Sequence, residues 1–294
     1  MQKLKNKKIP LYKQINRIFI LCNLTLLFIS CVKETHYVKK KFYTTGELLS
    51  ETSYLKKDSL RDGIFKVYYK NGNLKQLASF KKDIQSDSAI LYYEEGGLKF
   101  KEIFKGDTIF TSYYYRNGNI SILNTVLKGT PPKEIGWTKV FNKNKTFIDS
   151  LNYMVINGKR ILNQRIHYKD GLIALDSSTF YRMKVSKIKG ADKYKLKVNY
   201  FPSVKGATVL MIISKNINND FSNLKSVKLD TLLLKNNVLT ANLKEPYQNL
   251  KGFFYEYKAK VKHAVGKDSV RMSIHEKKTY FNEHIKVTDT IELR

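Results

Sequence analysis

Hydrophobic and polar positions alternate with a period of two residues through much of this chain. In the segment YKLKVNYF, residues 194–201, tyrosine, leucine and valine alternate with lysine and asparagine, and similar alternation runs through residues 255–265 and 269–275. Successive side chains of a β-strand point to opposite faces of the sheet. The pattern therefore predicts half-buried antiparallel strands, and we expect an all-β protein.

A second pattern repeats four times in the first half of the chain. Each copy has an aromatic residue followed by tyrosine, two turn residues, a glycine, one polar residue, and then leucine or isoleucine. The glycines recur at intervals of 26, 24 and 22 residues, at Gly46, Gly72, Gly96 and Gly118. Self-similarity at such a period is typical of stacked supersecondary units.

Each copy of the repeat predicts a β-hairpin. Asn71-Gly72 and Asn117-Gly118 are strong signals for two-residue turns, in which both central residues need a positive φ. A single hairpin is not stable alone, because it cannot bury enough apolar surface. We therefore expect the hairpins to stack side by side into one continuous twisted sheet.

The repeated frame, Tyr-Tyr-x-Asn-Gly-x-Leu followed by an alternating strand, resembles the bacterial variant of the MORN repeat over about residues 42–125. This resemblance implies a β-ribbon scaffold that binds protein or lipid, and some bacterial members are labelled antitoxins. Several second-half glycines of the usual unit are missing, for example around residues 86–88. Tyr69, Tyr93 and Tyr115 are candidates for a binding face, and the alternative is that they only pack across strands.

The remaining chain is expected to divide into two further regions. Residues 126–190 keep some turn signals, such as Asn157-Gly158 and Asp170-Gly171, and are expected to be degenerate repeats or a linker. Within them the stretch KGTPPKEIGW predicts a loop, because consecutive prolines disfavour regular structure. Residues 191–294 predict about seven strands, a number that fits an immunoglobulin-like or related β-sandwich.

The N-terminal segment has the organisation of a signal peptide. Residues 1–17 carry six basic residues and no acidic one, and residues 18–29 form an apolar run broken only by Asn23 and Thr25. The run is shorter than the roughly 20 apolar residues that a membrane-spanning helix needs. We expect residues 1–30 to be a signal peptide and residues 31–41 to be a tether.

The stretch LFISC, which ends at Cys31, resembles a bacterial lipobox, with a small residue directly before the cysteine. It departs from the usual pattern because Phe28 stands at position −3. The resemblance implies cleavage before Cys31 and lipidation of this residue, and several acyl chains give firm membrane anchoring. Val32 in place of aspartate, and the similarity of CVKET to surface-export signals of Bacteroidota lipoproteins, predict an outer-membrane anchor facing the periplasm or cell surface.

The charge of the chain is strongly positive, at +29. Only eight of the 54 basic residues are arginine, so lysine supplies 46 of them. Nucleic-acid recognition favours arginine forks, and export of the chain argues against a nucleic-acid partner. Two explanations of the charge therefore remain open. The lysines are a general feature of the composition and cover solvated strand faces, or they attract an anionic surface.

Motifs for catalysis and for cofactor binding are missing from the sequence. The five histidines have neither HxH nor HExxH spacing, and there is no nucleophile elbow or phosphate-binding glycine loop. We therefore expect no enzymatic activity, no cofactor and no metal site. The prediction is an envelope lipoprotein that binds or scaffolds a protein, glycan or anionic lipid. The alternative is an antitoxin-like or immunity protein that neutralises a toxin through its repeat face.

Overall fold

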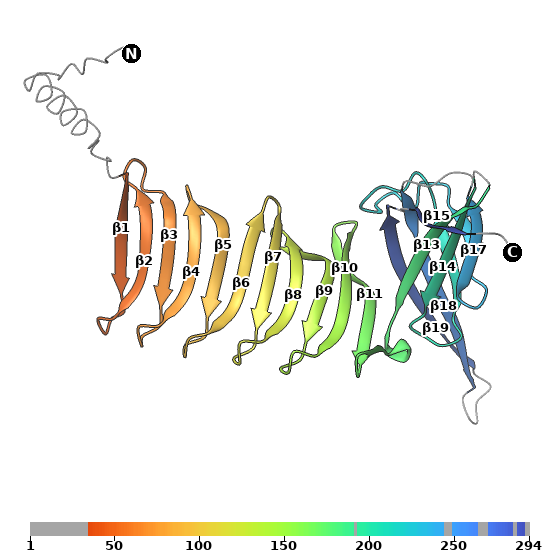
Figure 1. The fold of residues 1–294 in the computed structure, drawn as a ribbon, viewed down its shortest axis with the longest axis horizontal. Helices are drawn as coiled ribbons and strands as arrows, with labels where there is room; N and C mark the ends of the chain where they lie inside the picture. Colours follow the sequence, from red (N-terminus) through yellow and green to blue (C-terminus); the bar gives the residue numbers. More distant parts are fainter. Residues whose placement is uncertain (1–34, 191–192, 244–248, 264–269, 285–286, 292–294) are drawn as a thin grey trace, which may run out of the picture.

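The protein is a long antiparallel sheet followed by a β-sandwich, as the computed structural model shows (Figure 1). It describes residues 35–190, 193–243, 249–263, 270–284 and 287–291. The expected all-β fold is confirmed. The predicted signal peptide and Cys31 lie outside the described residues. Within the described ranges, no helix has the length and apolar character needed to cross a membrane.

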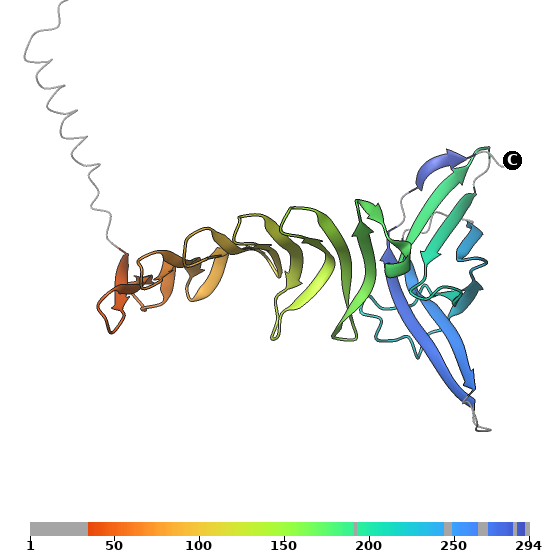
Figure 2. The same ribbon diagram turned by 90° about the horizontal axis from the view of Figure 1, so that it is seen from below.

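Neighbouring strands in the chain are also neighbours in the long sheet, so its twelve strands follow one another from β1 to β12. Viewed from below, the sheet is twisted along its length (Figure 2). Its strands are β1 (His36–Phe42), β2 (Leu48–Leu55), β3 (Arg61–Tyr68), β4 (Leu74–Lys81), β5 (Ile84–Tyr92), β6 (Leu98–Lys105), β7 (Thr108–Tyr114), β8 (Ile120–Leu127), β9 (Lys133–Phe141), β10 (Phe147–Ile156), β11 (Lys159–Lys169) and β12 (Leu172–Ile173).

The repeat turns differ from the predicted two-residue type. In the turn between β3 and β4, the Tyr69 N–H donates to the Asn73 carbonyl at 2.8 Å, and the Gly72 N–H donates to the Tyr69 carbonyl at 3.0 Å. Only the glycine has a positive φ, at 83°. The hairpins predicted at Asn71-Gly72 and Asn117-Gly118 are confirmed, but the predicted two-residue turn is wrong at both. Both are three-residue loops in which a turn is followed by a left-handed glycine.

A fifth turn of the same kind follows β9. The Asn142 N–H donates to the Thr146 carbonyl at 2.9 Å, and the Lys145 N–H donates to the Asn142 carbonyl at 3.1 Å. Asn142 stands where the other repeats have tyrosine, and Lys145, with φ 66°, stands where they have glycine. The four-copy pattern does not include this turn because both signature residues are replaced, and the turn lies in the region expected to hold degenerate repeats or a linker.

Other local predictions for the middle region can be compared with the structure. Both residues of Asn157-Gly158 and both of Asp170-Gly171 have a positive φ, so these two-residue turns are confirmed. The predicted loop KGTPPKEIGW is shorter than expected, because β9 begins at Lys133 directly after the prolines. β1 occupies residues 36–42 and so covers most of the segment expected as a tether.

The sandwich has two four-stranded sheets, ordered β17-β14-β13-β20 and β16-β15-β18-β19. Counted from β13, the first, second and fifth strands share one sheet, and the third, sixth and seventh share the other, as in immunoglobulin-like sandwiches. β13 lies within the range expected as degenerate repeat or linker. The strands are β13 (Phe180–Ile188), β14 (Tyr194–Phe201), β15 (Thr208–Ile213), β16 (Asp230–Leu233), β17 (Val238–Leu243), β18 (Leu250–His263), β19 (Val270–Glu283) and β20 (Val287–Ile291).

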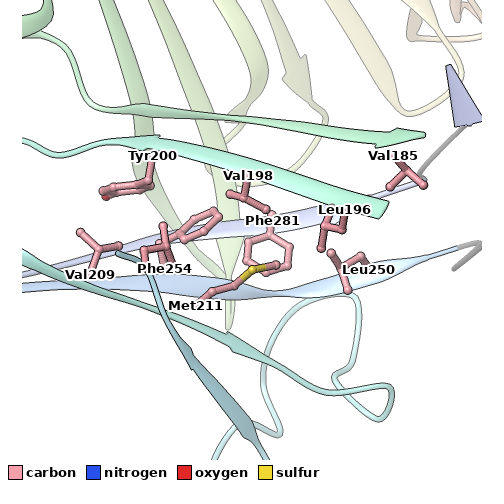
Figure 3. Packing of buried hydrophobic residues seen from close by; sticks show 10 residues of the cluster. Val185, Leu196, Val198, Tyr200, Val209, Met211, Leu250, Phe254 and Phe281 are labelled. Carbon is pink, nitrogen blue, oxygen red and sulfur yellow. The ribbon is translucent and has the colours of Figure 1, made fainter. Parts of the chain in front are cut away.

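The hydrophobic core of the sandwich lies between its two sheets. Val198 on β14 faces Met211, Phe254 and Phe281 from the opposite sheet, and all four side chains are fully buried (Figure 3). Phe254 also packs against the Tyr200 ring, with 4.9 Å between the ring centroids. Burial of such large side chains contributes about 1.5–3 kcal/mol each to folding. The sandwich therefore has a conventional two-layer core, whereas the long sheet is a single layer.

Asn163 on β11 joins the long sheet to the sandwich. Its side chain is fully buried. Its amide nitrogen donates to Asn152 Oδ1 at 3.0 Å and to the Tyr280 carbonyl at 2.9 Å, while the Tyr280 N–H donates to Asn163 Oδ1 at 2.6 Å. Beside it, Ile156 packs in a small buried cluster with Ile217 and Phe221 from a sandwich loop. The two parts are thus held by buried polar and apolar contacts.

Candidate functional site

The predicted binding-face tyrosines lie at the turns along one edge of the long sheet. The hydroxyl of Tyr69 donates to the Tyr92 carbonyl at 2.9 Å, that of Tyr93 to the Tyr114 carbonyl at 2.7 Å, and that of Tyr115 to the Phe141 carbonyl at 2.9 Å. Each tyrosine therefore links its own turn to the next repeat. All three tyrosines lie at repeat turns on the same edge of the sheet, and all three donate to a backbone carbonyl of the next repeat.

Cationic side chains cover the rings of two of these half-buried tyrosines, Tyr69 and Tyr93. The Lys75 ammonium lies 5.4 Å from the Tyr69 ring centroid, and the Arg116 guanidinium lies 4.8 Å from that of Tyr93. Such contacts are attractive because a cation faces the negative surface of the ring. Since the hydroxyls are already engaged, a partner at this edge would meet mainly the cations and the turn backbone. A ligand-binding role for the tyrosines stays a prediction.

Asparagine side chains make a second link between turns. The amide nitrogens of Asn71 and Asn73 donate to the Glu94 carbonyl of the next turn, at 3.2 Å and 2.9 Å. Asn117 and Asn119 bind the Lys143 carbonyl in the same way, at 2.9 Å and 2.8 Å. The Asn-Gly-Asn sequence thus serves to clamp neighbouring turns together. The asparagines therefore contact the next turn and do not form the two-residue turn that the Asn-Gly pair predicted.

A row of polar side chains crosses adjacent strands of the long sheet. Glu102 pairs in register with Thr111, and Thr111 pairs with Asn124. The hydroxyl of Thr111, the side-chain oxygen of Asn124 and the hydroxyl of Thr138 are buried without a hydrogen-bond partner in the described chain. Burial raises the pKa of the Glu102 carboxyl above its ordinary value. This row is a place where the sheet tolerates buried polar groups.

A cleft of about 510 Å³ opens at one end of the sandwich. It is bounded by the end of β14, at Phe201 and Ser203, and by the turn that contains Asn236 and Asn237. Both turn residues have a positive φ, a conformation that asparagine adopts more readily than most residues. The lining is mainly apolar, so the cleft offers contact area with few fixed polar groups.

Glu256 lies beside this cleft with its side chain fully buried. Its carboxylate accepts the backbone N–H groups of Ser203 and Val204, each at 3.0 Å, the Ser203 hydroxyl at 2.7 Å and the Tyr200 hydroxyl at 3.1 Å. Burial, together with this carboxylate, raises the pKa of the Tyr200 hydroxyl. These donors replace the water that a buried carboxylate loses, and so fix the loop after β14.

Ser203, His275 and Glu256 have the residue types of a catalytic triad but not its geometry. The Ser203 hydroxyl lies 3.1 Å from His275 Nε2, and Glu256 Oε1 lies 3.2 Å from the same nitrogen. In a triad the carboxylate binds the other ring nitrogen and orients the base. Here the carboxylate also accepts the serine hydroxyl directly. These hydrogen bonds hold the loop after β14 against β18 and β19.

A second cleft, of about 390 Å³, lies where the long sheet meets the sandwich. Trp137, Asn152 and Gln164 line it from the sheet, and Tyr181 and Glu283 line it from the sandwich. The Tyr181 hydroxyl donates to Glu283 Oε1 at 2.6 Å, and the Tyr181 N–H donates to Gln164 Oε1 at 3.2 Å. Burial and the nearby carboxylate raise the pKa of Tyr181, so its hydroxyl remains a donor at neutral pH. Sequence reasoning did not identify this cleft, because its residues come from distant strands.

Metal-ligating residues do not gather in the part of the chain that the structure describes. No group of three or more histidine, cysteine, aspartate or glutamate side chains there could hold a metal ion.

Comparison with known families gives one match. The family described as MORN repeat variant matches residues 61–82, which contain β3, the turn at Gly72 and β4. No match to a curated protein was found. The turn geometry of the matched segment recurs at the other repeat turns, including the one at Asn142 that has lost the signature residues. The chain therefore contains a MORN repeat variant, which indicates a binding or scaffold module.

Proposed function

We propose that the protein is a lipid-anchored envelope scaffold, in which the long sheet is a spacer between the membrane and the sandwich. The observation that carries this proposal is the strand order, which runs from β1 to β12 without a crossover. Strands lie about 4.8 Å apart, so the eleven intervals between twelve strands span roughly 50 Å. The sandwich would present its clefts at the end of this spacer.

The N-terminal end of the sheet supports an anchor at Cys31. β1 begins at His36, so only residues 32–35 separate the cysteine from the first strand. A lipid on Cys31 would therefore hold the edge of the sheet close to the membrane. Lys39 and Lys41, which share one face of β1, would then lie near anionic headgroups, where each basic residue contributes about 1 kcal/mol.

The contacts between repeats favour a stiff spacer. The tyrosine hydroxyls and the asparagine amides both connect one turn to the next along the same edge. Hydrogen bonds across successive turns resist bending of the sheet at the hairpin connections. The lysines of β1 also protect the exposed edge strand from pairing with other strands.

The role that we propose is non-enzymatic. The clustered Ser203, His275 and Glu256 side chains hydrogen-bond one another and hold the loop after β14 in place. A scaffold needs defined surfaces at a defined distance, and the sheet and sandwich provide both. The partner that we propose is a protein, glycan or anionic lipid of the envelope.

The anchor is tested by replacing each cysteine of the N-terminal segment. Cys31→Ala should abolish lipid attachment and signal cleavage, so that the uncleaved protein no longer reaches the outer-membrane fraction, whereas the matched control Cys22→Ala should process and fractionate like the wild type. Globomycin should reproduce the processing defect of Cys31→Ala. If Cys31→Ala remains processed and membrane-bound, the anchor proposal fails.

The spacer is tested by changing the number of repeats. Deleting residues 73–96 removes one 24-residue repeat unit between two equivalent turn glycines. This change should shorten the molecule by two strands, or roughly 10 Å. Small-angle X-ray scattering measures the maximum dimension, and duplicating the same segment should lengthen it equally. An unchanged dimension in two folded variants would contradict a linear spacer.

A further inference from the structure

We propose that the cleft between the long sheet and the sandwich is a saccharide-binding site. This inference names a ligand class for one surface of the scaffold and does not depend on the lipid anchor. It rests on an exposed indole, two oriented amides and one carboxylate that meet in the same cleft. The volume, about 390 Å³, lies within the usual range of small-molecule sites, which often form between domains.

The indole of Trp137 provides an apolar wall. Trp137 is the only tryptophan of the chain, and it is 42% exposed. It pairs in register with Asn152 on the neighbouring strand, so the two side chains share one face of the sheet. Within the described chain, no aromatic ring or cation stacks on this indole. Its face is therefore available for the C–H surface of a sugar ring, a contact that suits a large aromatic side chain.

Two amide groups are held by their oxygen atoms. Asn152 Oδ1 accepts a hydrogen bond from Asn163 Nδ2 at 3.0 Å, and Gln164 Oε1 accepts one from the Tyr181 N–H at 3.2 Å. Asn152 and Gln164 pair directly across β10 and β11. The Asn152 amide nitrogen has no hydrogen-bond partner among the described residues, whereas the Gln164 amide also hydrogen-bonds the Tyr181 hydroxyl, which engages one of its two donors. Since each amide nitrogen carries two donors, the pair can donate to adjacent hydroxyl groups of a ligand.

Glu283 supplies the complementary acceptor. Its Oε1 atom accepts the Tyr181 hydroxyl at 2.6 Å, which holds the carboxylate in place and leaves Oε2 for a ligand. Sugar hydroxyls both donate and accept, so they need donors and an acceptor on the same wall. Fixed side chains lower the entropic cost of ordering the site when a ligand binds.

The charge of the cleft favours a neutral ligand. Among the described residues that line the cleft, Glu283 is the only charged one. An anionic headgroup or phosphate would meet this carboxylate without a compensating cation. A neutral polyhydroxyl ligand avoids that repulsion and uses both the amides and the indole.

Trp137 allows a direct binding test. Its intrinsic fluorescence reports on this cleft without a label, because the chain has no other tryptophan. The full-length protein is titrated with chitotetraose, maltotetraose and mannotetraose. We expect a saturable change in fluorescence with at least one of the three. Isothermal titration calorimetry of Trp137→Phe should show weaker binding of that saccharide, because phenylalanine presents a smaller stacking surface.

Two near-isosteric substitutions test the amide donors. Asn152→Asp and Gln164→Glu keep the oxygen that accepts from Asn163 or Tyr181 and remove the amide nitrogen. Each should weaken binding roughly tenfold, in line with the loss of a hydrogen bond in a binding site. The matched control is Asn144→Asp in the exposed fifth turn, which should bind like the wild type.

Two results would overturn the proposal. One is the absence of a saturable change with any of the three saccharides up to millimolar concentration. The other is unchanged affinity in both amide variants, with thermal unfolding confirming that they are folded. Failure here would leave the anchor and spacer untouched, because Cys31 and the repeat units lie outside the cleft.

Discussion

Hydrogen bonds from tyrosine hydroxyls connect each repeat to the next one along the long sheet. Tyr43, Tyr69, Tyr93 and Tyr115 all donate to a backbone carbonyl in the following repeat. A buried or half-buried carbonyl that loses such a donor is left without a partner. The second tyrosine of each Tyr-Tyr pair is therefore expected to matter for stability, whatever it contributes to binding.

Tyr93→Phe should lower the free energy of unfolding by about 1 kcal/mol, because it removes the hydroxyl that binds the Tyr114 carbonyl at 2.7 Å. Urea denaturation followed by circular dichroism measures the effect. The control is Tyr37→Phe, whose hydroxyl makes only an exposed hydrogen bond to Ser59 at 3.3 Å. Equal stability losses in the two variants would argue against a structural role for the hydrogen bonds that the tyrosine hydroxyls make to the next repeat.

Glu102→Gln should stabilise the protein at neutral pH. Burial raises the pKa of this carboxyl above its ordinary value of 4.5, so the folded state holds the proton more tightly than the unfolded state. The stability that this proton contributes is fully present below pH 4.5 and is lost as the pH rises through the folded pKa. The neutral glutamine avoids that loss.

The melting temperatures of wild type and Glu102→Gln, measured between pH 4 and pH 7, test the predicted direction of this stability difference. The variant should melt higher at pH 7, and the two curves should converge toward pH 4. A constant difference at all pH values would mean that packing, and not ionisation, distinguishes the two side chains.

In each repeat turn, the last residue of the three-residue loop has a left-handed backbone conformation. Gly72, Gly96 and Gly118 fill this position with φ between 81° and 91°, and Lys145 fills it in the fifth turn with φ 66°. Left-handed backbone costs most residues about 1–2 kcal/mol, whereas glycine adopts it freely. The fifth turn therefore carries strain that the others avoid.

Reciprocal substitutions at this position should have opposite effects. Gly118→Ala should cost about 1 kcal/mol, and the cost lies in the backbone because an added Cβ meets no atom within 4 Å. Lys145→Gly should gain up to about 1 kcal/mol, since relief of strain exceeds the entropy that glycine loses on folding. Denaturant unfolding of both variants tests the pair, and a loss of stability in Lys145→Gly would contradict the strain.

The sequence predicted the strands better than the turns that connect them. Alternation located the strands, since a half-buried strand must place similar side chains on one face, and YKLKVNYF coincides with β14. The Asn-Gly pairs indicated hairpins correctly but gave the wrong loop length at Gly72 and Gly118. Their asparagines are selected for contacts with the next turn, which only the stacked sheet reveals. The repeat frame does not mark the fifth turn, because its backbone keeps the turn without glycine or tyrosine.

At the scale of the whole molecule, the joint between sheet and sandwich was beyond the reach of the sequence. Asn163 and Tyr280 are 117 residues apart, yet their side-chain and backbone groups form two hydrogen bonds. No local pattern marks a polar residue that becomes buried only when two parts of a fold meet. The same reason hid the cleft that contains Trp137 and Glu283.

Asn163→Ala should separate the sheet from the sandwich. It leaves the buried backbone groups of Tyr280 without partners, and the expected loss is about 3 kcal/mol. We expect a broadened or two-step thermal transition in calorimetry, in place of coupled unfolding. The control Asn249→Ala removes only an exposed contact to His284 at 3.2 Å and should leave the transition unchanged. A single sharp transition in Asn163→Ala would show that apolar packing alone couples the parts.

The sequential strand order also determines how the molecule would respond to mechanical load. A pull on the N-terminus against a fixed sandwich would act on β1 first, because this strand has a neighbour on one side only. Its hydrogen bonds to β2 would open one after another, and the next strand would then become the new edge. Each hairpin that peels away would release about one repeat of chain. Such a sheet would lengthen in small steps under modest force and would leave the sandwich folded.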